Sequence, residues 1–176
     1  MLKKVLLVVV VLIVIFVLVG FLLPTDYSAS RSVVIAADKA RIHEFVGDCK
    51  RWDDWAPWKE SDPSLVTTLG DKTTGVGAHQ SWTGEDGAGE LTLTKCSVEE
   101  GIAYDMNFIM DEEKVPAQSW MSYAAASGGV EVTWGMKGKM DMPVLGGWLV
   151  LMMGSSIDDM FEKGLQKLKT VAEARH

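Results

Sequence analysis

The sequence is poor in the residues that build metal sites and disulfide frameworks. Its 176 residues include two cysteines and three histidines, all far apart: Cys49, Cys96, His43, His79 and His176. The His43-Glu44 pair lacks the second histidine of the H-E-x-x-H zinc motif. The two cysteines could pair in an oxidising compartment, but unpaired thiols are the default for such a spacing. We therefore predict no metal and no cofactor, with His43 on a helix surface and His79 on a strand.

Positive charge is also scarce. From Thr25 onward the chain holds 15 basic and 24 acidic residues, a net charge of −9. Nucleic acids are held by lysines and arginines that neutralise phosphates, so this balance argues against DNA or RNA as a partner. It also argues against docking on anionic lipid through charge.

Catalytic motifs are missing as well. The sequence contains neither a nucleophile elbow nor a P-loop. Its acidic pairs are adjacent in sequence, so their side chains point apart and are expected to be solvated rather than to act as acid and base: Asp53-Asp54, Glu112-Glu113 and Asp158-Asp159. The sequence does not decide whether the protein is an enzyme, but the lack of catalytic motifs favours a non-enzymatic function.

One long apolar run is present, from Val5 to Leu23. As a helix it would span roughly 28 Å, close to the thickness of the hydrocarbon core of a bilayer. A cleaved signal peptide is the alternative, since Ser28-Ala29-Ser30 weakly resembles a cleavage site. We expect a retained anchor at residues 1–24 and one soluble domain at 25–176. Lys3 and Lys4 place the N-terminus in the cytoplasm and the domain on the extracytoplasmic side, which indicates a bacterial periplasm.

The order of elements in the domain predicts an α+β fold. Seven segments have the alternation or β-branched content of strands: 30–36, 65–69, 78–83, 90–99, 102–110, 117–126 and 130–137. Asp38 is positioned to cap a helix after the first strand, and Asp111 to Lys114 is expected to be a charged loop. A long helix is predicted from Val144 to Glu173. Its inner face is expected to carry Leu145, Leu149, Met152, Met160, Gly164, Leu168 and Val171. Consecutive hairpins imply a curved antiparallel sheet packed on that helix, with room for a cavity between them.

Several stretches resemble the helix-grip (SRPBCC) superfamily, which includes START lipid-transfer domains and Bet v-type allergens. They are SRSVVIAADKARIHEFVGD, WDDWAPW, GVGAHQSWTG, VEVTWGMKG and FEKGLQKLK, in this order between Ser30 and Val171. The chain most resembles the bacterial branch called polyketide cyclase/dehydrase and lipid transport. This resemblance implies the fold and a cavity, and it transfers no catalytic residue.

The inner face of the sheet supplies the candidate site. Side chains predicted to line a cavity are Gln80, Trp82, Tyr104, Met106, Phe108, Trp134 and Met136, with Met152 from the long helix. For the tryptophans, core packing is as plausible as cavity lining, because both use the same face. Methionine suits pockets for flexible apolar ligands. The run Trp52, Trp55 and Trp58 is expected to plug one end of the sheet. A role at a membrane interface or at the mouth of the cavity is the alternative.

These observations leave three hypotheses. The leading one is a membrane-anchored protein that binds an apolar or lipid-like small molecule. The second is a cyclase or dehydratase, which the resemblance alone suggests and for which Tyr104 is the best inward-facing titratable residue. The third is a partner-binding structural module with a filled core.

Overall fold

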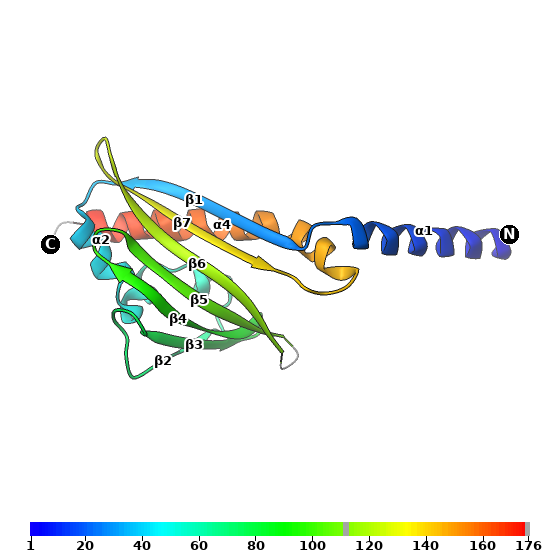
Figure 1. Ribbon diagram of the computed structural model, residues 1–176, viewed down its shortest axis with the longest axis horizontal. Helices are drawn as coiled ribbons and strands as arrows, with labels where there is room; N and C mark the ends of the chain where they lie inside the picture. Colours follow the sequence, from blue (N-terminus) through cyan, green and yellow to red (C-terminus); the bar gives the residue numbers. More distant parts are fainter. Residues whose placement is uncertain (111–112, 175–176) are drawn as a thin grey trace.

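The computed structural model describes residues 1–110 and 113–174 of the chain (Figure 1). The elements in chain order are α1 (Leu2–Leu22), β1 (Asp26–Ile35), α2 (Lys39–Val46), the 3-10 helix η1 (Cys49–Asp54), α3 (Trp58–Ser61), β2 (Val66–Leu69), β3 (His79–Gly84), β4 (Gly87–Ser97), β5 (Gly101–Met110), β6 (Glu113–Ala126), β7 (Gly129–Lys139) and α4 (Leu145–Glu173).

All seven predicted strands are present, and they form one antiparallel sheet. The strand order is β1-β7-β6-β5-β4-β3-β2. The first two strands in sequence, β1 and β2, therefore form the two opposite edges of the sheet, and β1 pairs with β7. Most strands run longer than predicted, and β1 already starts at Asp26 because its first residues pair with the end of β7. Of the predicted charged loop, residues 111–112 lie outside the described residues, whereas Lys114 belongs to β6. The curved sheet against one long helix confirms the predicted α+β helix-grip fold (Figure 1).

The segment between β1 and β2 closes one end of the sheet. Asp38 caps α2 as predicted, since its side chain accepts a hydrogen bond from the Arg41 backbone N–H at 2.7 Å. Trp52 and Trp55 then turn inward and are almost completely buried. Their indole nitrogens donate to backbone carbonyls at the end of α2. These two tryptophans therefore plug the sheet, and the alternative that they contact a membrane is wrong.

Helix α4 packs on the core mainly from Ile157 onward, with Met153 partly buried against it one turn earlier. Phe161, Leu165 and Leu168 are buried against the core, and Gly164 lies directly on the Trp134 ring. The N-terminal half runs past the sheet towards α1 (Figure 1). The prediction that Leu145 and Met152 share the buried face is wrong, because the helix is longer than the sheet surface it covers.

Helix α1 projects from the end of the domain (Figure 1). It is 21 residues long, and nearly all of its side chains are exposed. Among the described residues it is the one helix with the length and composition needed to cross a membrane. A signal sequence near the N-terminus would have the same properties, so these features alone do not separate the two.

Two glycines of α4 allow a matched test of this packing. A Cβ at residue 164 would lie 2.6 Å from Trp134 Cζ3 and 3.1 Å from Pro57 Cδ, whereas a Cβ at residue 154 would meet no atom within 4 Å. We expect Gly164→Ala to lower the free energy of unfolding by about 1–3 kcal/mol through overpacking. Gly154→Ala should raise it by about 0.5–1 kcal/mol through helix propensity. Urea unfolding of the detergent-solubilised chain measures both, and equal stabilisation by the two variants would contradict the packing.

Candidate functional site

An apolar cavity of about 130 Å³ lies between the inner face of the sheet and α4. Its walls come from α3, the loop before β2, the strands β3, β5, β6 and β7, and α4. The lining residues are Trp58, Leu65, Trp82, Tyr104, Met106, Phe108, Ser119, Trp134, Met136, Met160 and Phe161. This volume is below the roughly 300–1,000 Å³ of drug-sized ligand sites. It compares with engineered cavities of about 150 Å³ that accept benzene.

Six of the eight predicted site residues line this cavity: Trp82, Tyr104, Met106, Phe108, Trp134 and Met136. Gln80 is buried on the same face of β3 but is not part of the cavity wall. Its Oε1 atom has no hydrogen-bond partner within the described residues. The prediction that Met152 lines the cavity is wrong, because its side chain is 74% exposed and lies on the part of α4 that extends past the sheet.

Five residues of the wall were not among the predicted site residues: Trp58, Leu65, Ser119, Met160 and Phe161. Of these, Trp58 belongs to the run for which the mouth of the cavity was an alternative. Ser119 could have been found from strand alternation, because it lies two residues before the buried Met121. Met160 was already on the predicted inner face of the long helix, and Phe161 follows it. Leu65 was placed at the start of a predicted strand, but it belongs to the irregular segment before β2, where strand alternation does not predict the side-chain direction.

A small polar cluster lies in this otherwise apolar wall. The Trp134 indole N–H donates to both the Tyr104 hydroxyl and the Ser119 hydroxyl, each at 3.2 Å. Ser119 in turn donates to the Gly135 carbonyl at 2.8 Å. Burial raises the pKa of Tyr104 to about 12, so its hydroxyl stays protonated at neutral pH. Tyr104 can therefore donate a hydrogen bond, either to Ser119 or to an acceptor atom of a ligand.

Aromatic contacts hold the rest of the wall. Trp134 stacks on Phe161 with ring centroids 4.5 Å apart, and Tyr104 packs against Trp52 at 5.4 Å. Trp82 and Phe108 meet edge to face at 6.1 Å. Rings in such arrangements fix one another's orientation. The methionines of the wall are the adaptable part, because their unbranched side chains can change rotamer to fit a ligand.

A second small cavity, of about 120 Å³, adjoins the first and shares Leu65, Trp82 and Phe108 with it. Asp62 lies on its rim and is almost fully buried. The carboxylate accepts hydrogen bonds from the Ser64 hydroxyl at 2.5 Å, the Ser64 N–H at 2.8 Å and the Asp86 N–H at 3.2 Å. The hydrogen bond from the Ser64 hydroxyl is the main cause that lowers the pKa of Asp62. Asp62 thus ties the segment before β2 to the β3–β4 turn.

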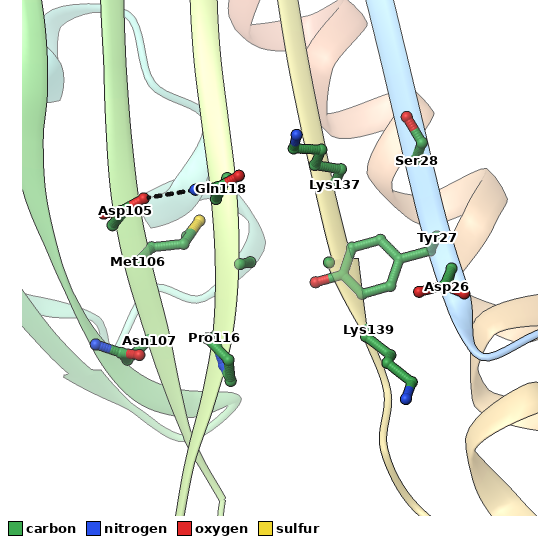
Figure 2. A pocket seen from close by; sticks show the side chains of 12 residues that line it. Asp26, Tyr27, Ser28, Asp105, Met106, Asn107, Pro116, Gln118, Lys137 and Lys139 are labelled. Atoms are coloured by element: carbon green, nitrogen blue, oxygen red, sulfur yellow. Dashed lines mark hydrogen bonds between the residues drawn. The ribbon is translucent and has the colours of Figure 1, made fainter.

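A wider groove of about 880 Å³ lies at the end of the sheet nearest α1, across β1, β5, β6 and β7 (Figure 2). Its side chains are largely polar or charged, and Asp105 and Gln118 are joined by a hydrogen bond of 3.2 Å (Figure 2). This groove is open, so it does not remove a ligand from water. The apolar cavity is more enclosed and is therefore the better candidate site.

His43 was predicted to lie on a helix surface, but it is half-buried between β4 and β6. Its Nε2 atom is 3.3 Å from Cys96 Sγ, and its Nδ1 atom is 3.3 Å from the Tyr123 hydroxyl. Burial lowers the pKa of His43 and raises the pKa of Cys96, which favours a neutral imidazole and a neutral thiol.

Cys49 and Cys96 are both free thiols, as expected. Within residues 1–110 and 113–174, no three potential ligands gather into a metal site.

Comparisons with known proteins agree with this fold. The sequence model of the family described as polyketide cyclase/dehydrase and lipid transport matches residues 27–173. A solved structure from Chromobacterium violaceum is 15% identical, covers 84% of this chain and 98% of that chain, and has a TM-score of 0.58. The structure of a protein from Mesorhizobium loti is 8% identical, covers 82% of this chain and 96% of that chain, and has a TM-score of 0.61. The structure of the di-domain ARO/CYC protein BexL is 16% identical, covers 86% of this chain and 52% of that chain, and has a TM-score of 0.58. No curated protein matches the chain. Identities this low establish a common fold and no more.

The polar cluster can be tested by a double-mutant cycle. Tyr104→Phe or Ser119→Ala alone leaves the Trp134 N–H with one acceptor, so each should cost about 0.5–1.5 kcal/mol of unfolding free energy. The double variant leaves a buried donor without a partner, which adds a penalty of about 1–3 kcal/mol beyond the sum of the two. Urea unfolding measures the coupling. Strict additivity would show that the indole does not depend on these two hydroxyls.

The Asp62 hydrogen bonds predict a pH dependence of stability. The pKa of Asp62 in the folded state lies below its unfolded value of about 3.9. Its contribution is therefore complete above the unfolded pKa and is lost as the pH falls through the folded pKa. Asp62→Ala should lower the urea midpoint at about pH 6, and the difference from the unaltered protein should shrink at about pH 3. Asp86→Ala removes a neighbouring carboxylate but none of these hydrogen bonds, so its effect should be smaller at both pH values.

Proposed function

Because the chain belongs to the polyketide cyclase/dehydrase and lipid transport family, we propose that its inner cavity binds an apolar small molecule. The observation that carries this proposal is the composition of the wall. Of its eleven residues, nine are aromatic or aliphatic groups without an ionisable atom, and the other two are Tyr104 and Ser119. Burial of apolar ligand surface, at about 25 cal/mol per Å², would supply the affinity.

The size and polarity of the cavity narrow the class of ligand. A volume of about 130 Å³ accommodates one aromatic ring or a short alkyl segment rather than a whole lipid. A larger ligand would have to displace Met106, Met136 or Met160, or extend past Trp82 and Phe108 into the adjoining cavity. Within the cavity, the Tyr104 hydroxyl can donate a hydrogen bond to a carbonyl or hydroxyl oxygen of the ligand. The preferred ligand is therefore apolar with a single polar oxygen.

Binding is favoured over cyclase or dehydratase chemistry by the titratable groups. Tyr104 is the one ionisable residue among those that line the cavity, and its raised pKa makes it a poor base at neutral pH. Proton abstraction needs a group with a pKa near the working pH. The neutral His43 cannot serve in its place, because it faces Cys96 and Tyr123, neither of which lines the cavity.

We further propose that residues 1–24 remain attached as a membrane anchor and that residues 25–176 form the ligand-binding domain. Supporting this are the 21-residue apolar helix and the stacking of Phe16 on Trp148 of the domain, with ring centroids 4.8 Å apart. Lys3 and Lys4 favour a cytoplasmic N-terminus and a periplasmic domain. Native mass spectrometry of the protein extracted from its own membrane tests this directly. The intact mass reports whether residues 1–24 are retained, and any co-extracted mass identifies the class of ligand.

Binding itself can be tested with p-cresol, a single neutral ring that carries one hydroxyl, by isothermal titration calorimetry of the detergent-solubilised chain. We expect saturable binding that Met160→Trp weakens roughly tenfold, or about 1.4 kcal/mol, because the indole fills the cavity. Met152→Trp is the matched control, since it adds the same side chain on the same helix at a 74% exposed position. Equal affinities for both variants, or no saturable binding to the unaltered chain, would reject the cavity as the site.

A further inference from the structure

A second apolar segment lies at the start of α4. From Met142 to Gly154 the chain carries no charged side chain, and its one polar side-chain atom is the Trp148 indole nitrogen. We call these residues the α4 entry segment; they form the loop before α4 and the first third of the helix. Much of it is open to solvent, with Leu145 47%, Leu151 59% and Met152 74% exposed. Contiguous exposed apolar surface of this kind marks a contact with another apolar phase.

The entry segment lies directly beside the last turns of α1. Trp148 stacks on Phe16 with an angle of 6° between the rings, and its indole nitrogen is 3.4 Å from the Phe16 carbonyl oxygen, to which it donates. Further along, Gly20 lies against Val144, and Gly147 lies against Leu23. Phe16 is six residues from the end of α1, which corresponds to roughly 9 Å along the helix axis.

The ends of β5 and β6 also carry exposed apolar side chains. Met110 pairs with Glu113 at the end of the sheet from which α1 leaves (Figure 1). Both Ile109 and Met110 are about two-fifths exposed. Lys139, at the end of β7, lies 3.5 Å from Asp141, so the two charges partly offset each other. At this end of the domain, the α4 entry segment is therefore the part that offers apolar contact, whereas the groove across β1 and β7 is polar or charged.

We propose that the α4 entry segment is embedded in the bilayer interface beside α1. The proposal rests on the membrane anchoring by α1 proposed above. The depth of Trp148 along α1 matches the 5–10 Å to which interfacial helices bury their apolar faces. Tryptophan is also the residue preferred at this level of the membrane. Because Met153 and Met160 are seven residues apart on one face of α4 and both pack on the core, the helix connects the bilayer to the cavity wall.

The experiment uses the full chain in vesicles of phosphatidylcholine brominated on the acyl chain near the headgroup. Bromine quenches tryptophans that contact the lipid, and flotation of the vesicles reports anchoring separately. We expect Trp148→Phe to remove most of the bromine-dependent quenching. Trp120→Phe is the control on the sheet, since Trp120 packs over Gly135. In the Trp148→Phe background, Met152→Trp should restore quenching, whereas Val66→Trp, 61% exposed on β2, should not.

The outcomes distinguish the embedded entry segment from membrane anchoring by α1. Flotation together with quenching that follows residues 148 and 152 supports the embedded entry segment. Flotation without such quenching overturns it while leaving α1 as the anchor, and means that water or a protein partner covers the segment. Failure to float overturns the anchor and the embedded segment together. Quenching that does not change when anionic phosphatidylglycerol is added supports apolar insertion, and strong dependence on it would overturn that mode of contact.

Discussion

The arrangement of the domain depends on the packing of one side chain, Trp134, in the middle of β7. Its ring is almost completely buried and stacks on Phe161 of α4, while Trp55 meets it edge to face at 5.3 Å. Gly164 allows the helix backbone to approach the same ring. Sheet, long helix and the tryptophan-rich segment therefore all meet on one indole. Interiors are packed as tightly as organic crystals, so a shift in any of these elements moves the others.

The same packing limits the candidate site. Where the helix lies directly on Trp134, the space between helix and sheet is filled, and the cavity begins only beside this contact, towards Trp82 and Phe108. The Trp134 N–H must also be satisfied in a buried setting, which explains why Tyr104 and Ser119 are the polar groups of an apolar wall. Core packing and cavity lining are thus two roles of the same residues.

Sequence patterns predicted most of the fold because its signals are local. Alternation along β5 placed Tyr104, Met106 and Phe108 on one face, and the structure brings all three to the cavity. Errors arose where tertiary geometry decides. Helical periodicity assigned Met152 to the inner face, but periodicity does not reveal where the sheet ends beneath the helix. His43 was assigned to the surface because its partners, Cys96 and Tyr123, lie 53 and 80 residues away in sequence. The cavity volume follows from rotamers and has no sequence signal.

The mismatch between α4 and the sheet connects these observations. At 1.5 Å per residue the 29-residue helix is about 43 Å long, whereas the ten residues of β1, its main partner in the sheet, extend about 33 Å. Roughly 10 Å of helix must therefore project, and a projecting turn in water is expected to be polar. In this chain it is the least polar part of the domain, and it lies against α1. Both features have one physical explanation if the projecting part of α4 and the end of α1 share the same apolar surroundings.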